Sequence, residues 1–135
     1  MLFRSAKIGD FYQEADFKKE KHSPVIEGPD SVKADTAATF TASVGKEIGH
    51  PNTTEHHIEW INLYFKPDND KFIYHLSNSE FRAHGAAVKG ANEGPTYTEP
   101  ATQVTVTLKE SGTLIATSYC NIHGLWESQK KVTVG

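Results

Sequence analysis

The sequence predicts an all-β protein, built as a β-sandwich or a small barrel. Short runs rich in β-branched and aromatic residues recur along the chain, and turn signals containing Gly and Pro separate them. No stretch shows a sustained apolar period of about 3.6 residues with helix caps. Seven or eight short strands at this spacing are typical of β-sandwiches. Because the 135 residues contain no internal repeat or low-complexity tract, we expect one domain over 1–135, with 1–19 as a polar N-terminal arm.

The first half of the chain contains four predicted strands. Turn residues at 28–30 end the first of them, and apolar and polar residues alternate in the second. The third is long and aromatic, and the sequence Pro-Asp-Asn-Asp at 67–70 predicts a hairpin turn into the fourth. These strands are PVIE (24–27), ATFTASV (38–44), HIEWINLYF (57–65) and KFIYHL (71–76).

The second half predicts four more runs, the first of them brief. An irregular stretch over 85–102 is expected to be a long crossing loop, and residues 110–112 predict a turn between the next two strands. The runs are EFRAH (80–84), QVTVTLK (103–109), TLIATSYC (113–120) and KKVTV (130–134).

Composition excludes several classes of protein. Fourteen basic and seventeen acidic residues give a net charge of −3, which argues against a nucleic-acid partner. No apolar run approaches the length of a membrane span, and the N-terminal residues do not resemble a secretory signal, so we expect a cytoplasmic protein without membrane contact. The single cysteine, Cys120, excludes an intrachain disulfide and a four-cysteine metal site. Seven histidines favour a metal site of another kind.

Cys120 and His123 form the first candidate motif, Cys-Asn-Ile-His-Gly. A thiolate and an imidazole three residues apart, followed by Gly124, are able to bend round one metal ion. The spacing alone is a weak signal, and the alternative is a buried cysteine that ends a strand as a small apolar residue.

The second candidate motif is His-Pro-Asn-Thr-Thr-Glu-His-His at 50–57. The turn after His50 is expected to wind one helical or 3₁₀ turn that folds His50 and His56 toward each other. His57 is expected to point elsewhere and is not counted as a ligand. The alternative is a polar loop with surface histidines.

The third motif is Glu20-Lys21-His22, for which the alternative is a solvated charged stretch. His75 and His84 lie in predicted strands without nearby partners and are interpreted as structural or surface residues. Together the motifs offer five donors that suit a first-row transition metal. Five donors exceed the four of structural zinc, and four imidazoles in a plane with an axial thiolate leave one position open. The candidate ligands are His22, His50, His56, Cys120 and His123.

The segments EKHSPVIE, HPNTTEHHI and CNIHGLWE, together with AHG at 83–85 and YTEP at 97–100, closely resemble the superoxide reductase family, specifically its one-iron neelaredoxin class. The resemblance covers about Asp16 to Val134, with Ser23 where the family often has Val. It implies an immunoglobulin-like β-sandwich with one iron per chain, and a role in cytoplasmic detoxification. It also implies that the four histidines are equatorial ligands, Cys120 is the axial ligand, Glu20 takes the sixth position in the ferric state and Lys21 lies beside the open face.

The implied reaction is the one-electron reduction of superoxide to hydrogen peroxide, with re-reduction by an external donor such as rubredoxin. The resemblance further implies a homotetramer. The alternative is a small blue-copper electron carrier, which is also an all-β sandwich with Cys and His near the C-terminus. Such sites use two His, one Cys and a weak axial Met, whereas the only Met in this sequence is Met1.

Overall fold

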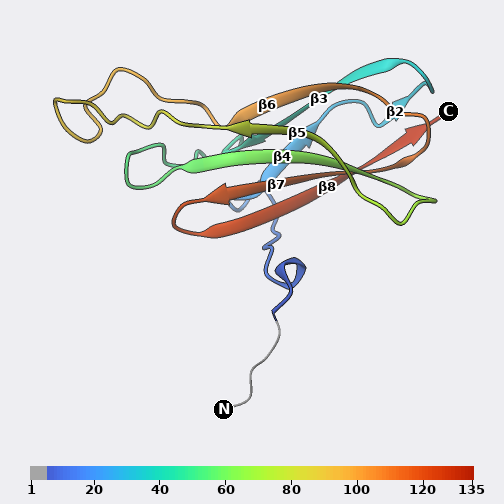
Figure 1. The fold of residues 1–135 in the computed structure, drawn as a ribbon, viewed down its shortest axis with the longest axis horizontal. Coiled ribbons are helices and arrows are strands. Elements are labelled where there is room, and N and C mark those ends of the chain that lie inside the picture. The colour runs from blue at the N-terminus through green and yellow to red at the C-terminus, as the bar shows by residue number, and fades with distance from the viewer. Residues whose placement is uncertain (1–5) are drawn as a thin grey trace, which may run out of the picture.

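The protein is a two-layer β-sandwich in the computed structural model, which describes residues 6–135. One sheet has three strands in the order β1-β3-β6, and the other has five in the order β2-β8-β7-β4-β5 (Figure 1). Neighbouring strands are antiparallel except β2 and β8, which are parallel. The strands are β1 Pro24–Glu27, β2 Ser31–Val32, β3 Ala37–Val44, β4 Ile58–Pro67, β5 Tyr74–Glu80, β6 Ala101–Thr107, β7 Gly112–Cys120 and β8 Gly124–Val134. The predicted all-β sandwich is confirmed.

Alternating side chains build the core between the two layers. Along β7, and in β4 from Ile61 onward, every second residue is buried. Leu63 and Leu114 are fully buried from the five-stranded sheet, and Phe40 is fully buried from the facing sheet. One of the two apolar clusters in this core includes Cys120. The thiol therefore lies where the core meets one end of the sandwich.

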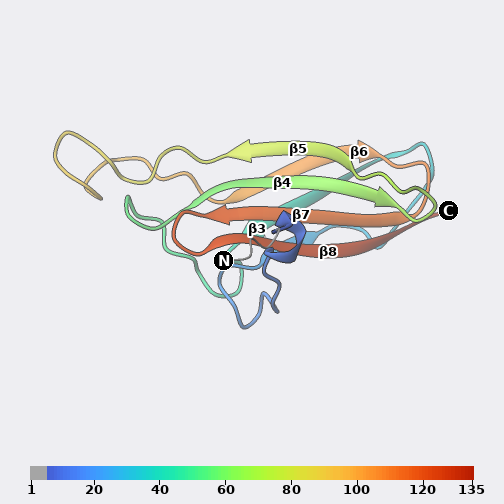
Figure 2. The ribbon, with the colours of Figure 1, turned by 60° about the horizontal axis from the view of Figure 1, so that its bottom comes forward.

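The long connection between β5 and β6 extends beyond that same end of the sandwich. Figures 1 and 2 both show it projecting past the sheets, beside the shorter connection that leads into β4. The C-terminus lies at the opposite end. The predicted long crossing loop is thus present, and it runs over residues 81–100.

Two of the predicted strands are wrong in their bounds. The runs expected at 71–76 and 80–84 are replaced by the single strand β5. Asp70 accepts a hydrogen bond from the backbone N–H of Phe72 (2.9 Å) and another from the hydroxyl of Tyr74 (2.7 Å). These local bonds hold the chain in a turn until Tyr74. After Phe81 the chain leaves the sheet, so residues 82–84 are not a strand.

Two further elements of the five-stranded sheet differ from expectation. The two-residue strand β2 was not predicted, because it depends on parallel pairing with residues 133–134 at the far end of the chain. The last strand was expected only over 130–134, but β8 begins at Gly124, and its residues 124–132 pair with the whole of β7.

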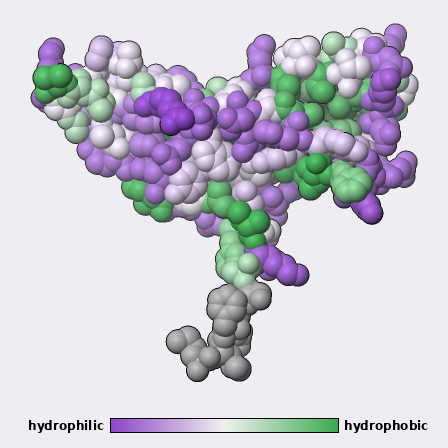
Figure 3. All heavy atoms as spheres, in the orientation of Figure 1, coloured by the Kyte–Doolittle hydropathy of each residue, from purple (hydrophilic) through white to green (hydrophobic). Residues whose placement is uncertain are grey.

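The N-terminal arm is anchored to this sheet at Gln13. The backbone of Gln13 bridges to β8 through Leu125 and Glu127, with N···O distances of 3.0 and 2.9 Å. Before it, residues Ile8–Asp10 form a 3₁₀ turn. Figure 3 shows a largely hydrophilic face with apolar groups gathered where the arm meets the body, and Ile8 and Phe11 are exposed in the arm. Residues 1–5 of the expected arm, including Met1, lie outside the described residues. Within 6–135, no helix has the length and apolar character needed to cross a membrane.

Candidate metal centre

Strand register brings the three predicted motifs to one end of the sandwich. The start of β1 pairs with the end of β3, since Pro24 lies opposite Val44, so His22 before β1 and His50 after β3 meet there. The start of β4 pairs with the end of β7, where Ile58 lies opposite Cys120. The segment that ends in His56 therefore arrives beside Cys120.

The four predicted histidines surround a common space. Their ring centroids form a four-sided figure whose sides are 4.8 Å (His22–His50), 4.7 Å (His50–His56), 5.0 Å (His56–His123) and 4.4 Å (His123–His22). The diagonal from His22 to His56 is 6.0 Å. Donor atoms of His22, His56, Cys120 and His123 all lie within 4.8 Å of one another. This arrangement fits a metal ion ringed by imidazoles.

Hydrogen bonds indicate which nitrogen of His22 and of His50 faces this space. Nδ1 of His22 lies 2.7 Å from Oε1 of Glu20, and Nδ1 of His50 lies 2.6 Å from the carbonyl oxygen of Pro51. If each Nδ1 carries the proton, each Nε2 is left with a lone pair. Both Nε2 atoms are buried and have no hydrogen-bond partner among residues 6–135. Orphaned buried nitrogens of this kind are what a metal ion would satisfy.

The other two histidines face each other across the same space. Nε2 of His56 lies 3.3 Å from Nδ1 of His123. The candidate donors are therefore three Nε2 atoms and one Nδ1 atom, together with the sulfur of Cys120. Imidazole and thiolate donors suit iron, copper and zinc rather than magnesium or calcium.

Cys120 ends β7 with its side chain fully buried. The backbone N–H of His123 donates to Sγ (3.4 Å), and Sγ lies 3.8 Å from Nδ1 of His123. An N–H aimed at the sulfur holds it in place as a candidate metal ligand. His22 is also buried whereas His123 is exposed, so the cluster opens to solvent on the side of His123.

Burial favours the neutral form of three of the four imidazoles, those of His22, His50 and His56. It lowers the pKa of His50 to about 4, with the carbonyl of Pro51 opposing and the charges of neighbouring His22, His56 and Lys21 adding to the effect. Burial is also the main cause that lowers the pKa of His22 and of His56. Neutral imidazoles at pH 7 are ready to bind a metal without first losing a proton.

Comparison with known proteins agrees with this site. The sequence profile of the desulfoferrodoxin family matches residues 14–129, a range that contains all five donors. The chain belongs to the desulfoferrodoxin family. The neelaredoxin of Megalodesulfovibrio gigas is 55% identical over 95% of this chain and 98% of its own, and the superoxide reductase of Pyrococcus furiosus is 47% identical over 90% and 96%.

Solved structures give the same assignment. A crystal structure of a Thermotoga maritima protein is 56% identical and superposes with a TM-score of 0.94, covering 97% of this chain and 99% of its own. The reduced superoxide reductase (neelaredoxin) of Archaeoglobus fulgidus is 50% identical with a TM-score of 0.83, covering 90% and 98%. The predicted resemblance to one-iron superoxide reductases is confirmed.

Two residues of this desulfoferrodoxin-family site had expected roles beside the ligands. Glu20 was expected to take the sixth metal position in the ferric state. In this structure its Oε1 instead accepts from the backbone N–H of His22 (3.1 Å) and lies 2.7 Å from the His22 ring. The bond to His22 is also the main cause that lowers the pKa of Glu20. Lys21 is half-buried and adjoins His22 in the chain, and its positive charge is a minor cause of the lowered pKa of His22, His50 and His56.

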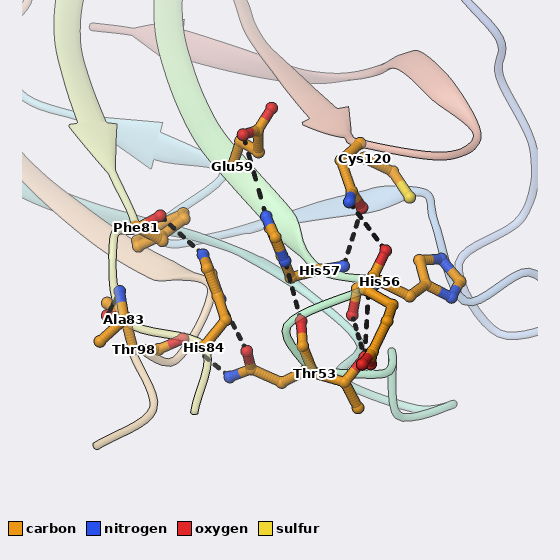
Figure 4. Close-up of polar contacts among 12 residues, drawn as sticks. Thr53, His56, His57, Glu59, Phe81, Ala83, His84, Thr98 and Cys120 are labelled. Carbon is orange, nitrogen blue, oxygen red and sulfur yellow. Dashed lines mark hydrogen bonds and ion pairs between the residues drawn. The ribbon is translucent and has the colours of Figure 1, made fainter. Parts of the chain in front are cut away.

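The turn between His50 and His56 differs from its predicted form. It contains bends and no helical or 3₁₀ turn. The hydroxyl of Thr53 accepts from the backbone N–H of His56 (3.0 Å), so a side chain supplies the bond that a helical turn would supply. His56 and His57 point to opposite sides of the chain (Figure 4).

The other three histidines, His57, His75 and His84, have contacts apart from the four-histidine cluster. His57 stacks on buried His84, with ring centroids 3.5 Å apart and planes within 4° of parallel (Figure 4). The two nitrogens of His84 lie 2.9 Å from Oδ1 of Asn52 and 2.8 Å from the carbonyl oxygen of Phe81. His75 is exposed on β5.

Three residues that support the cluster were not predicted from the sequence. Trp126 stacks on His22 with centroids 5.1 Å apart, and Gln13 donates to the carbonyl oxygen of His123 (2.8 Å). Asn121 accepts from the N–H of His57 (2.9 Å) and donates to the carbonyl oxygen of Glu55 (2.9 Å). These bonds join the segment that carries His56 to the turn that carries His123. Trp126 and Asn121 belong to the segment CNIHGLWE, whereas nothing in the sequence around Gln13 signals its contact.

Proposed function

We propose that this chain is a superoxide reductase that converts superoxide to hydrogen peroxide at one iron. The observation that carries the proposal is the ring of four imidazoles beside one buried thiolate, with the Nε2 atoms of His22 and His50 free of other partners among residues 6–135. Relatives named superoxide reductase or neelaredoxin, similar over nine-tenths or more of this chain, support the same activity.

The five donors would hold the iron, and each has a contact that prepares it. Glu20 and the carbonyl of Pro51 orient His22 and His50 through their Nδ1 atoms, and the N–H of His123 supports the Cys120 sulfur. When bound, ferrous iron supplies one electron to superoxide, which with two protons becomes hydrogen peroxide as the iron becomes ferric. Lys21 would draw the anionic substrate toward the open side. Glu20 would exchange its contact with His22 for the vacant position in the ferric state.

The partners and the setting belong to the same proposal. An external one-electron donor of the rubredoxin type would return the iron to the ferrous state. The protein would act in the cytoplasm as a homotetramer, and residues 1–135 would form one domain with the arm of 1–19.

Metal analysis tests the choice of iron. About one iron per chain in natively purified protein is expected. Copper or zinc in its place would contradict the proposal. A blue-copper site uses two His and one Cys, and the four imidazoles around Cys120 exceed that set.

The activity is tested by adding superoxide to the reduced protein while both peroxide and dioxygen are followed. Peroxide without dioxygen is the result expected for a reductase. Stoichiometric dioxygen would identify a dismutase and overturn the proposal.

A further inference from the structure

The long loop between β5 and β6 carries the two sequence motifs that the metal site does not use, Ala83-His84-Gly85 and Tyr97-Thr98-Glu99-Pro100. The two motifs pair with each other across the loop. The N–H of Thr98 donates to the carbonyl oxygen of Ala83 (2.7 Å), and the N–H of Gly85 donates to that of Thr96 (3.1 Å). The base of the loop is therefore closed as a short antiparallel ladder.

This ladder fixes Tyr97 over Gly85. A Cβ atom at Gly85 would lie 2.5 Å from the Tyr97 hydroxyl, and Gly85 has a φ of +88°. Only glycine fits this close approach without strain. The Tyr97 hydroxyl then donates to the carbonyl oxygen of Asn92 (3.0 Å) near the turn of the loop. Asn92 itself has a φ of +63°, a conformation that asparagine tolerates better than most residues.

Both ends of the Asn92 side-chain amide contact the segment 50–57, which carries His50 and His56. Its Oδ1 accepts from the backbone N–H of Thr54 (2.6 Å). Its Nδ2 donates to Glu55, 2.9 Å from Oε2 and 3.1 Å from Oε1. Thr54 and Glu55 are the two residues immediately before His56. The loop thus holds the segment that presents one of the four imidazoles.

We propose that Asn92 is a positioning residue of the metal centre: it fixes Thr54 and Glu55 and thereby the place of His56. The inference rests on the proposed function only in requiring that the cluster binds a metal. Contacts that support metal ligands typically contribute about 10- to 100-fold to metal affinity, and Asn92 acts one residue further out, so we expect the lower end of that range.

The first test measures iron release from ferrous protein into an excess of a coloured ferrous chelator. Asn92→Ala is expected to release iron about ten-fold faster than the wild type. The matched control is Asn78→Ala, which removes another exposed amide contact, the 2.7 Å bond from Nδ2 of Asn78 to Oδ1 of Asn62 between β4 and β5. Release from Asn92→Ala at the rate of the wild type or of this control would overturn the proposal.

The second test exchanges the donor and acceptor roles. Asn92→Asp places a carboxylate against Glu55 and is expected to release iron faster still, because like charges repel. In the double variant Asn92→Asp/Glu55→Gln, one oxygen of the introduced carboxylate accepts from the Thr54 N–H and the other accepts from the introduced amide, so the contact is restored with its direction reversed. The double variant is expected to return toward the wild-type rate, and a rate equal to that of Asn92→Asp alone would contradict the proposal.

A spectroscopic readout separates positioning from general stability. In Co²⁺-substituted protein, Asn92→Ala is expected to shift the thiolate-to-cobalt absorption band, and Asn78→Ala is expected to leave it in place. An unshifted band in Asn92→Ala would contradict a positioning role. Neither iron release nor the cobalt spectrum needs superoxide, so a protein that binds iron but makes no peroxide would refute the proposed function and leave this inference standing.

Discussion

Cys120 belongs both to the apolar core and to the cluster of metal donors. Its neighbours on β4 and β7 exclude water from one side of the sulfur, and the N–H of His123 supports it on the other. A thiolate held in this way gives strong sulfur-to-metal absorption and pushes electron density toward the metal.

Cys120→Ser tests this role. A serine hydroxyl does not ionise at neutral pH, so the variant is expected to lose the visible charge-transfer band of the oxidised protein and to turn over more slowly. The absorption spectrum and the peroxide assay measure the two effects. A band and an activity that both persist unchanged would show that Cys120 is not a ligand.

In this structure the Glu20 carboxylate contacts the ring of the candidate ligand His22. Glu20→Ala is expected to retain iron, because all five proposed donors remain. The ferric spectrum should change more than the ferrous spectrum, since the carboxylate is proposed to reach the metal only in the ferric state. Iron content and the spectra of both oxidation states measure this. Complete loss of iron would instead make Glu20 essential to the site.

His50 gives the metal-free protein a pH-dependent stability. Its pKa is about 4 in the folded chain against an ordinary value of 6.5, so between these values the unfolded chain binds a proton that the folded chain does not. The free energy of unfolding should therefore fall as the pH drops from 6.5 toward 4, and this group should add no slope above 6.5. His22 and His56 act in the same direction.

His50→Gln should make this decline shallower, because it removes one of the groups that resists protonation. Urea unfolding of the metal-free proteins at several pH values between about 7.5 and 4.5 measures the slopes. Identical slopes in wild type and variant would exclude His50 as a cause.

Among the elements, β1 depends on a close contact between the residue that follows it and its neighbouring strand β3. Gly28 follows β1, and a Cβ atom there would overlap the fully buried ring of Phe40 on β3. Since β1 begins directly after His22 and Ser23, its position also sets the entry of His22 into the metal centre.

Gly28→Ala is expected to destabilise the fold by about 1–3 kcal/mol, because the buried ring has no room to move aside. Gly9→Ala is the matched control, since a Cβ atom at Gly9 meets nothing within 4 Å. Chemical unfolding of both variants measures the difference. Equal stability of the two variants would show that Phe40 accommodates the added methyl group at position 28 without loss of stability.

At the scale of the whole molecule, the net charge of −3 opposes an anionic substrate. A fast encounter with superoxide therefore requires positive charge beside the site, where focusing raises association rates by about ten-fold or more. Lys21 is the proposed source of this charge, because it adjoins His22 in the chain and adds to the lowered pKa of His22, His50 and His56. The alternative is a lysine whose stem only covers apolar surface.

Lys21→Met and Lys21→Arg separate these roles. Lys21→Met is expected to react more slowly with superoxide and with a weaker dependence on ionic strength, because salt screens only the charge that remains. Lys21→Arg keeps the charge and should stay close to wild type. The second-order rate of the ferrous protein across ionic strength measures both. Equal rates and salt slopes in all three proteins would reject steering by Lys21.

The sequence by itself determined the β character of the chain and supplied the candidate donors. Alternation in 38–44 and 103–109 marked strands that the structure contains, because burial of every second side chain is a local pattern. The spacing of Cys120 and His123, and of His50 and His56, supplied the donor types. Prediction from the sequence failed over 71–84, where the hydrogen bonds of Asp70 compete with strand pairing.

Only the tertiary structure decided how the donors are arranged and supported. Which nitrogen of His22 faces the cluster depends on Glu20, and the place of His56 depends on contacts from residues far along the chain, such as Asn92 and Asn121. Antiparallel register joins the start of β4 to the end of β7 and so places His56 beside Cys120. These relations arise from pairings across long sequence separations, which leave no periodic signal in the local sequence.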